Sequence, residues 1–384
     1  MLDVMATLLL VVWCLLTVQT VINLLVFRSL ATATDEPTSR VSPVSIVIPA
    51  RNEERSVGRT IDAALRQDYP DFEVIVVDDE STDGTADEIA RRSSDARLVP
   101  VSSRPLEPGW LGKPNALATG AAKASGKWIL FMDADVELHP QALRDAVAAC
   151  EQGGWDHLAL LPHLEREGFW EGLLMPVIPV VAFVYIPSFL AFFSGTRMAA
   201  GGGAFGLVRR EAYESMGGHD RIKNSVVDDV RLAMELKAAG FKSRARFGMH
   251  RLRLRMYHGL DEFIEGFTKN AHAGFGRSIV KPVVFVLVGL WVGLMPFLWP
   301  VLALLSPASA FTGSVGAVGA SLALVVASRA LVHLRLGFPL WSIAFAPLAT
   351  IVTLFIVLRS LRMTRRDGVV RWRGREYPHE STEF

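Results

Sequence analysis

Two aspartates separated by one alanine, Asp133 and Asp135, follow an apolar stretch at residues 128–132. In an extended segment successive side chains point to opposite faces, so both carboxylates are expected to project the same way. Like charges a few ångströms apart repel by about 1 kcal/mol in water and about 4 kcal/mol near a protein surface. The pattern predicts a positive group between them, and a hard divalent cation suits such a pair. A solvated turn or helix cap is the other role open to these acids.

Two further pairs of acids lie where the secondary structure is expected to change. Asp78 and Asp79 end the apolar run at residues 73–77, and Asp228 and Asp229 come just before a helix with one apolar face. A carboxylate within hydrogen-bond reach of a hydroxyl can act as a general base. Capping of the helix N-terminus is the competing role for either acid of the second pair.

Expected strands and helices alternate along the first third of the chain. The strands are at residues 44–48, 73–77, 98–101 and 128–132, and helices are expected with apolar positions from 57 to 65, after a cap around residues 81–85, and at residues 115–124. This alternation predicts an α/β fold with a mostly parallel sheet. Ligands collect at the carboxyl ends of such strands. The acids at positions 78, 79, 133 and 135 all lie at that edge.

Composition indicates a membrane protein. Of 384 residues, 51% are hydrophobic, above the norm for soluble domains. The formal net charge is only +1, so whole-molecule charge does not support nucleic-acid binding. The two cysteines, Cys14 and Cys150, allow no disulfide framework and suit a reducing compartment. We therefore expect the catalytic part in the cytoplasm.

The nearly charge-free segment 4–27 has about the 20 residues needed to cross a bilayer. A signal peptide is the alternative, because residues 31–33 resemble a cleavage site. The run is too long for a signal-peptide core, and Asp3 stands where a positive group is expected. The pattern therefore favours an uncleaved anchor, and Arg28 after it favours a cytoplasmic domain downstream.

Other apolar segments lie at residues 173–193, 283–305, 315–334 and 340–358. Three prolines at positions 176, 179 and 187 argue against a straight helix in the first of them. We expect this segment to be interfacial or re-entrant, with a buried core helix as the alternative. The last three give up to three further spans before an arginine-rich tail that favours the cytoplasm. The number of true spans stays open.

Several ordered motifs make residues 44–275 resemble a family 2 glycosyltransferase with a GT-A fold. The matching stretches are IPARNE at 48–53, VVDDESTDGT at 76–85, GKPNAL at 112–117, MDAD at 132–135, the glycine run at 201–206 and the acid pair at 228–229. The resemblance implies inverting transfer of a sugar from a nucleoside diphosphate, with UDP as the expected nucleotide. It also implies a divalent cation, Mg or Mn, at the diphosphate.

The resemblance implies roles for individual residues. Asp133 and Asp135 would hold the metal, with Asp135 as the direct ligand, and Asp133 would also meet the donor. Asp229 would be the base, whereas Asp228 replaces the usual glutamate. The expected donor-nucleotide contacts are Pro49, Ala50, Arg51, Asn52, Glu53, Asp78, Asp79 and Lys113, and the loop for donor sugar and acceptor is Gly201, Gly202 and Gly203. For Lys113 the alternative is an ordinary surface lysine, and for the glycine loop it is a purely structural turn.

Three motifs bear on the type of enzyme. Residues 201–206 also match G-x-G-x-x-G, the dinucleotide fingerprint, but that motif requires a buried strand directly before it, and residues 196–200 make a poor one. The Gln-x-x-Arg-Trp motif of processive synthases is missing at residues 266–272, which argues against chain elongation. The tail WRGREY at 372–377 resembles membrane glycosyltransferases associated with hopanoid and carotenoid biosynthesis, with Trp372 and Arg375 as possible contacts. A basic membrane-facing tail is the alternative.

Together these patterns predict a multi-pass protein of the cell membrane that glycosylates a hydroxyl of an isoprenoid lipid, hopanoid- or carotenoid-like, on the cytoplasmic side. The expected divisions are an anchor at 1–30, a GT-A catalytic domain at 42–275 that includes the segment 173–193, a transmembrane region at 281–360 and a basic tail at 361–384. The expected partners are a nucleotide sugar, a lipid acceptor and the bilayer, without nucleic acid. A polyprenyl-phosphate acceptor, another glycolipid acceptor and an inactive membrane scaffold remain as alternatives.

Overall fold

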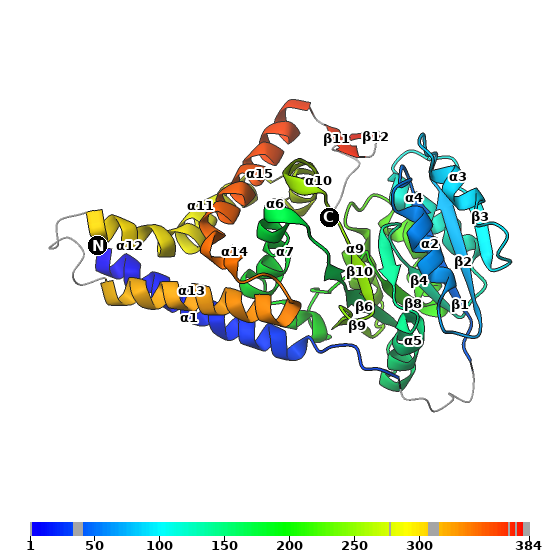
Figure 1. The fold of residues 1–384 in the computed structure, drawn as a ribbon, viewed down its shortest axis with the longest axis horizontal. Helices are drawn as coiled ribbons and strands as arrows, with labels where there is room; N and C mark the ends of the chain where they lie inside the picture. The colour runs from blue at the N-terminus through cyan, green and yellow to red at the C-terminus, as the bar shows by residue number, and fades with distance from the viewer. Residues whose placement is uncertain are drawn as a thin grey trace. The chain divides into compact units, whose positions relative to one another are not determined.

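A computed structural model describes residues 2–33, 41–275, 278–305, 315–367, 369–372 and 375–378. The chain forms two compact units (Figure 1). The helical unit comprises residues 1–26, 166–189 and 257–368, and the sheet unit comprises residues 27–165, 190–256 and 369–384. Each unit is therefore assembled from segments that are far apart in the sequence.

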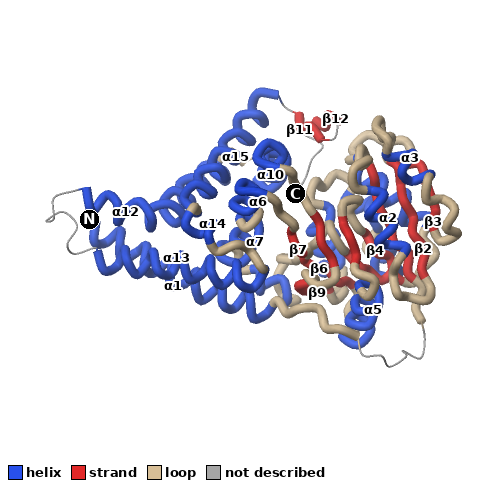
Figure 2. Tube along the Cα trace, in the orientation of Figure 1, coloured by secondary structure: helices blue, strands red, loops and turns tan. Residues whose placement is uncertain are grey.

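A seven-stranded sheet with the order β3-β2-β1-β4-β8-β6-β9 forms the centre of the sheet unit (Figure 2). Its strands are β1 (Val44–Ala50), β2 (Phe72–Asp78), β3 (Leu98–Ser102), β4 (Trp128–Phe131), β6 (His157–Leu161), β8 (Gly206–Arg209) and β9 (Ser243–Phe247). Only β8 runs antiparallel to its neighbours, β4 and β6. The predicted α/β fold with a mostly parallel sheet is confirmed.

Helices cover both faces of this sheet. Alternate residues of β1 separate two cores: Ile46 and Ile48 pack with α2 and α5, whereas Val47 packs with α4, α8 and α9. The helices are α2 (Val57–Leu65), α3 (Thr85–Ala90), α4 (Gly112–Lys123), α5 (Ala142–Gly153), α8 (Arg210–Ser215), the short 3-10 helix η3 (Gly218–Ile222) and α9 (Asp228–Ala238). The helix α4 starts earlier than the sequence predicts, so Lys113 lies in its first turn.

Strand register aligns the ends that matter for ligands. Ala50 pairs with Asp78, and Val47 pairs with Phe131, so β1, β2 and β4 present their carboxyl ends at one edge. Smaller sheets complete the unit: β5 (Val136–Leu138), β10 (Leu252–Leu254) and β7 (His163–Leu164) pair together, and β11 (Val369–Trp372) forms a hairpin with β12 (Arg375–Pro378). The predicted first strand was too short, because β1 continues through Pro49 and Ala50 before the turn.

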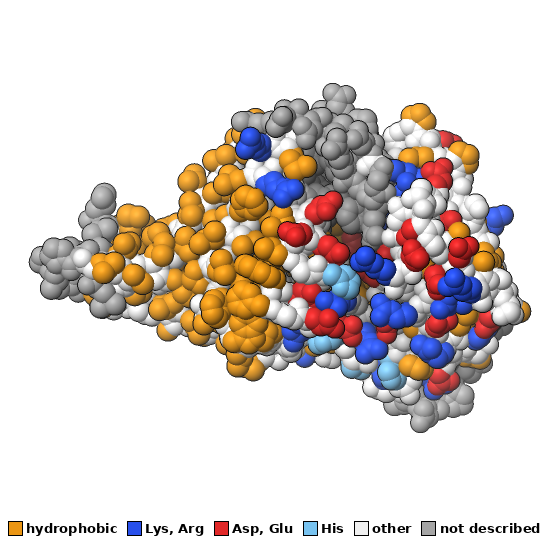
Figure 3. Space-filling model, turned by 45° about the horizontal axis from the view of Figure 1, so that its top comes forward, with side chains coloured by type: hydrophobic (Ala, Val, Ile, Leu, Met, Phe, Trp, Pro, Cys, Tyr) orange, Lys and Arg blue, Asp and Glu red, His pale blue; other side chains and the backbone are white. Residues whose placement is uncertain are grey.

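Among its described residues, the helical unit contains five helical segments long and apolar enough to cross a membrane: Asp3–Val26, Gly168–Tyr185, Val280–Leu302, Val315–Leu336 and Ala346–Met363. Its elements are α1 (Leu2–Val26), α6 (Gly168–Leu174), α7 (Val177–Val180), the π-helical η1 (Val181–Tyr185), α10 (Gly259–Phe275), α11 (Val280–Val288), the π-helical η4 (Gly289–Leu294), α12 (Met295–Leu305), α13 (Val315–Leu336), α14 (Trp341–Ala344) and α15 (Ala346–Asp367). Apolar side chains cover much of its exposed surface (Figure 3). This surface is what a bilayer requires.

Prolines interrupt the helix in the segment 173–193, as predicted. A buried side chain of α1 donates hydrogen bonds to carbonyl oxygens at this interruption. Pro187 has no N–H to give to the carbonyl of Phe183 four residues earlier. The side chain of Asn23, fully buried, donates from Nδ2 to Phe183 O (2.8 Å) and to Ile186 O (2.9 Å) instead. Irregular backbone inside an apolar unit is tolerated when its polar groups find such partners. An interfacial position of this segment stays a prediction.

We expect Gly120→Ala to destabilise the sheet unit. A Cβ on Gly120 of α4 would lie 2.4 Å from Val47 Cγ1 on β1, closer than any real contact. The core would have to shift, at a cost of about 1–3 kcal/mol. Thermal unfolding of the purified protein measures this, with Gly195→Ala as the matched control because that Cβ would meet nothing within 4 Å. Equal melting temperatures for both variants would show that α4 does not pack against β1 this closely.

Candidate functional site

The turn after β1 is bound to the segment after β2. The N–H of Asn52 donates to Ser81 Oγ (3.1 Å), and Asn52 Oδ1 accepts from the N–H of Thr82 (2.8 Å). Asn52 and Glu80 both have positive φ angles, 54° and 55°. Non-glycine residues hold this conformation at a cost of about 1–3 kcal/mol each, and such strain clusters at ligand sites. The hydrogen bonds between the two segments hold this strained pair in place.

Further contacts complete this end of the sheet. Arg51 Nη1 donates to the carbonyl oxygens of Asp79 and Glu80, and the N–H of Glu53 donates to Thr85 Oγ1 (2.8 Å). Asp78 Oδ1 accepts from the N–H of Ser81, and the N–H of Asp79 donates to Ala50 O. The residues predicted at positions 50–53, 78 and 79 therefore do lie together.

The carboxylate of Asp79 is buried and paired with an arginine from the end of the chain. Arg375 Nη1 lies 2.5 Å from Asp79 Oδ2, and Arg375 Nη2 lies 2.5 Å from Glu80 Oε2. Burial raises the pKa of Asp79, while Arg375 and Arg51 act in the opposite direction. The predicted tail residue Arg375 thus reaches the predicted nucleotide site. The backbone of Trp372 lies in β11, but its side chain is outside the described residues.

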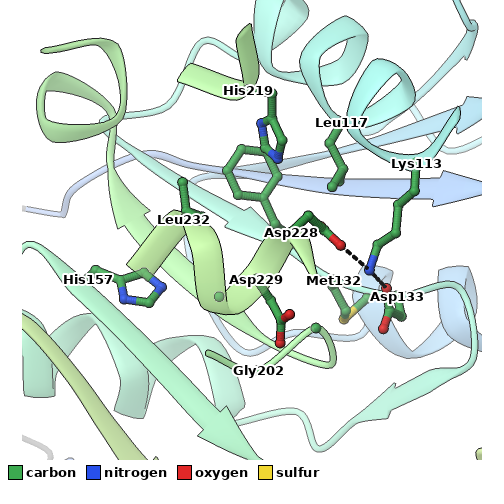
Figure 4. A pocket seen from close by; sticks show the side chains of 13 residues that line it. Lys113, Leu117, Met132, Asp133, His157, Gly202, His219, Asp228, Asp229 and Leu232 are labelled. Atoms are coloured by element: carbon green, nitrogen blue, oxygen red, sulfur yellow. Dashed lines mark ion pairs between the residues drawn. The ribbon is translucent and has the colours of Figure 1, made fainter. Parts of the chain in front are cut away.

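A second group of side chains surrounds the ammonium of Lys113 in a pocket (Figure 4). Lys113 Nζ lies 2.8 Å from Asp133 Oδ1 and 3.3 Å from Asp228 Oδ1. Burial alone would lower the pKa of this ammonium, but Asp133, Asp228 and Asp229 raise it well above its ordinary value. Lys113 is therefore a permanent cation that joins the end of β4 to the start of α9.

Asp229 is half-buried in the same pocket and turns toward Gly202, whereas Asp228 faces Lys113 (Figure 4). Burial raises the pKa of the Asp229 carboxyl to about 6, the charge of Asp228 raises it too, and Lys113 opposes both. A carboxylate with a pKa near neutrality can accept a proton and release it again. Asp229 therefore has the properties of a general base, and Asp228 serves to bind the lysine.

Asp133 and Asp135 do not share the face of a strand, so that expectation was wrong. The strand β4 ends at Phe131, and residues 134 and 135 form a turn before β5. The predicted positive group does exist at Asp133, where it is Lys113. The turn, and not strand alternation, therefore sets the direction of the Asp135 side chain.

The acids at positions 133 and 135 fit a divalent cation shared with a diphosphate. Asp133 is about one-third exposed and Asp135 is half-buried, so both carboxylates have solvent access. Within the described part of the chain, no group of three or more acids, histidines or cysteines is placed to hold a metal. Mg²⁺ in nucleotide sites commonly takes one or two carboxylates, and phosphate and water supply its other ligands.

The glycine loop before β8 lets three segments approach one another. A Cβ on Gly201 would lie 2.4 Å from the carbonyl carbon of Asp229, and one on Gly203 would lie 2.8 Å from Asp133 Oδ2. A Cβ on Gly202 would lie 3.1 Å from Leu160 O. Gly201 is thus required by close approach to backbone, whereas a side chain at position 203 would have to displace the carboxylate of Asp133. Because this loop precedes a strand and follows an irregular segment, the dinucleotide fingerprint does not apply.

Two buried histidines of the pocket were missed from the sequence. His219 Nδ1 hydrogen-bonds Tyr213 Oη (2.7 Å), and His157 Nδ1 hydrogen-bonds Ser243 Oγ (2.8 Å). Burial lowers the pKa of His157 to about 4, and burial together with Lys113 lowers that of His219 to about 3. Both rings are neutral at pH 7. For His219, the pair of glycines directly before it was the available sequence signal of a tight turn, and their φ angles are 92° and 58°.

Comparison with known proteins agrees with this geometry. Residues 45–216 match the family described as Glycosyl transferase family 2, which confirms the resemblance seen in the motifs. A curated relative, the 4,4'-diaponeurosporenoate glycosyltransferase of Staphylococcus aureus (strain MRSA252), is 28% identical over 341 residues. The match covers 87% of this chain and 88% of the relative. The predicted likeness to the carotenoid-associated branch is confirmed.

A solved structure shares the fold. The mannosyltransferase PcManGT from Pyrobaculum calidifontis, in complex with GDP-Man and Mn2+, aligns with a TM-score of 0.54 at 18% sequence identity. The alignment covers 94% of this chain and 99% of that chain. The predicted GT-A architecture is therefore confirmed.

We expect Arg375→Ala to lower stability by about 1–3 kcal/mol at pH 7, because it leaves the buried Asp79 without its nearest cation. Burial has raised the pKa of Asp79, so on acidification the folded chain binds a proton before the unfolded chain does. The stability loss should therefore shrink as the pH falls toward that pKa. Thermal unfolding at several pH values measures the effect.

The control for this prediction is Arg97→Ala. Arg97 pairs with Asp95 at 2.8 Å, but both side chains are substantially exposed, and such pairs contribute about 0–1 kcal/mol. If both variants lose the same stability at every pH, the hairpin arginine does not neutralise Asp79.

Proposed function

We propose that this glycosyltransferase, whose residues 45–216 form a family 2 domain, is an inverting enzyme that glycosylates a membrane lipid. Its donor is a nucleoside-diphosphate sugar, with UDP as the nucleotide, and its acceptor is a hydroxyl of an isoprenoid lipid of hopanoid or carotenoid type. The observation that carries the proposal is the pocket in which Asp229, with a pKa of about 6, faces the glycine loop beside the Lys113–Asp133 pair. The relative named for a diaponeurosporenoate acceptor supports the lipid class.

The donor nucleotide would lie at the carboxyl ends of β1 and β2. Asp79 and Asp78 offer carboxylate oxygens to base and ribose, and the turn from Pro49 to Glu53 would close over them. Asp79 Oδ2 already accepts a hydrogen bond from the guanidinium of Arg375. Asp79 can therefore bind the nucleotide only if Arg375 moves away or binds the carboxylate together with the nucleotide. The tail would therefore take part in donor binding.

The acceptor hydroxyl would be activated by Asp229. Its carboxylate takes the hydroxyl proton while the oxygen bonds to the anomeric carbon, and the bond from that carbon to the diphosphate oxygen breaks with its electron pair. One displacement inverts the anomeric centre. Lys113 keeps its positive charge throughout, because three carboxylates hold its pKa far above neutrality. The glycines at 201 and 203 let the loop backbone come close to Asp229 and Asp133, so the donor sugar and the acceptor would meet backbone at this place.

A divalent cation, Mg or Mn, held by Asp133 and Asp135 would neutralise the departing diphosphate as a Lewis acid. Lys113 on Asp133 supplies a further positive charge at the same place. Lys113 would stabilise the negative charge that develops on the diphosphate as its bond to the sugar breaks, and a bound metal would supply further Lewis-acid stabilisation there.

The apolar helices would bring the lipid to the donor. We assign residues 1–30 as the anchor, 42–275 as the catalytic domain with the interfacial segment 173–193, 281–360 as the transmembrane region and 361–384 as the basic tail. The protein would be multi-pass in the inner membrane with its catalytic domain in the cytoplasm, where nucleotide sugars are made. Arg28 after the first span favours that side.

A polyprenyl-phosphate or other glycolipid acceptor is the second candidate. A phosphate oxygen is already ionised, so the transfer would not need Asp229 as a base. The inactive-scaffold alternative is set aside, because the family 2 domain and the glycosyltransferase relative both indicate an enzyme.

We expect Asp133→Ala combined with Asp135→Ala to remove the metal-dependent part of UDP binding. In the proposal, these two carboxylates would be the protein's oxygen ligands to a cation shared with the diphosphate. Calorimetric titration of UDP with and without Mn²⁺ measures this on the full-length protein. Asp95→Ala is the control, since Asp95 pairs with Arg97 on the surface. Unchanged Mn²⁺-dependent affinity in the double variant would rule out this metal site.

We expect Asp229→Asn to lower kcat by about 10²–10⁴-fold with little change in UDP affinity, because general-base catalysis is lost. In the unchanged protein, activity should fall as the pH drops through about 6, where Asp229 takes up its proton. Asp220→Asn is the control, because that side chain is 77% exposed. A variant at position 229 that keeps most of its rate would favour the polyprenyl-phosphate acceptor.

The substrates can be identified in membranes that contain the full-length protein. A panel of labelled nucleotide sugars is supplied, and mass spectrometry determines which lipid gains a sugar. Consumption of no donor under any metal condition would contradict the proposed reaction.

A further inference from the structure

Cationic side chains gather at the open edge of the sheet unit, on β9. The N–H of Phe247 donates to Arg28 O (2.9 Å), so the segment that follows α1 lies along this strand. Arg244 and Arg246 alternate on β9 with buried neighbours, so both point to the same side. Burial lowers the pKa of Arg246, and Arg244 and Arg28 lower it further. The guanidinium of Arg246 is therefore close enough to those of Arg244 and Arg28 for their charges to repel it.

Lys237 of α9 adds a fourth positive charge. Burial lowers the pKa of this ammonium, and the charge of Arg244 lowers it as well. Lys237 Nζ donates to Ala191 O (3.0 Å), Thr196 Oγ1 (3.0 Å) and Met198 O (2.6 Å). These oxygens satisfy its hydrogen bonds but are neutral. They leave its charge uncompensated.

The four cations have no acidic partner within the part of the chain that the structure describes. Arg244 Nη1 donates to Ser243 O (2.9 Å) and Arg246 Nη1 to Ala245 O (3.0 Å), and both acceptors are again neutral. Other arginines of this unit are paired, such as Arg144 with Asp68 at 3.0 Å. A local excess of positive charge without carboxylates predicts an anion from outside the chain.

The surroundings of this cluster indicate where that anion comes from. Arg28 comes two residues after Val26, the last residue of a candidate span, so its Cα lies within about 8 Å of the end of that span. The guanidinium of Arg246 lies 4.7 Å from the ring centre of Trp155 and 5.9 Å from that of Phe192. Aromatic rings beside basic residues at the end of a span are typical of the headgroup layer.

We propose that Arg28, Lys237, Arg244 and Arg246 form a binding surface for the phosphate headgroups of anionic membrane lipids. Arginines on an edge strand can also serve to prevent pairing with another sheet. That role does not account for Arg28, which lies outside the strand, or for Lys237, which lies on α9. Phosphate groups accept several hydrogen bonds from guanidinium and ammonium groups at once, so they match the whole cluster.

The test uses the purified full-length protein in detergent with equal amounts of phosphatidylglycerol and phosphatidylcholine, and native mass spectrometry counts the lipids retained. The unchanged protein should retain phosphatidylglycerol preferentially. Arg28→Gln combined with Arg244→Gln should lower this preference by about thirtyfold, since each basic residue near a headgroup layer contributes about 1 kcal/mol. Neither residue belongs to the catalytic pocket.

The matched control is Arg97→Gln combined with Arg144→Gln, which removes the same charge from arginines that are paired with carboxylates. This control should keep the preference, as should Arg28→Lys with Arg244→Lys. If the double glutamine variant does not fold, Arg28→Gln alone should still lower the preference by about fivefold, because Arg28 is exposed. Equal retention of both lipids by the unchanged protein, an unchanged preference in the glutamine variants, or displacement of phosphatidylglycerol by equimolar inorganic phosphate would each overturn the proposal.

Discussion

One ammonium group holds the pocket together. Lys113, in the first turn of α4, pairs with Asp133 after β4 and with Asp228 at the start of α9. Without a cation, carboxylates gathered in one partly buried place would repel one another and resist ionisation. Lys113 pairs with Asp133, the proposed metal ligand, and it limits the rise in the pKa of Asp229. In the proposed reaction, the donor side and the acceptor side of the site would thus depend on the same ammonium group.

Glycine residues let the backbone segments around this interaction come close to one another. The glycine loop passes between β4 and α9, and side chains at positions 201 and 203 would meet the backbone of Asp229 and the carboxylate of Asp133. Glycine costs conformational entropy on folding, so its use here reflects close approach and not a need for flexibility. The order of segments also explains why a glycine pattern like the dinucleotide fingerprint has a different purpose in this chain.

Each unit contains polar or charged groups whose usual partner is replaced or must come from elsewhere. In the helical unit, Pro187 leaves the carbonyl of Phe183 without its usual donor, and Asn23 supplies one from a different helix. In the sheet unit, Arg244 and Arg28 repel Arg246, and no carboxylate among the described residues pairs with these three side chains. The first requirement is satisfied inside the chain, because an apolar environment offers no alternative. The second can be satisfied by the anionic surface of a membrane.

The sequence by itself determined the α/β order, the strand ends that carry Asp78, Asp79 and Asp133, and the apolar helices, because these depend on local periodicity and composition. It also placed Asp228 and Asp229 at a helix start. Only the tertiary structure decided that Lys113 binds Asp133 and Asp228, that Arg375 reaches Asp79 across almost 300 positions, and that two buried histidines line the pocket. The direction that strand alternation predicts for the Asp135 side chain is wrong, since this residue lies in a turn. Contacts between segments distant in sequence depend on packing and burial, which no local pattern records.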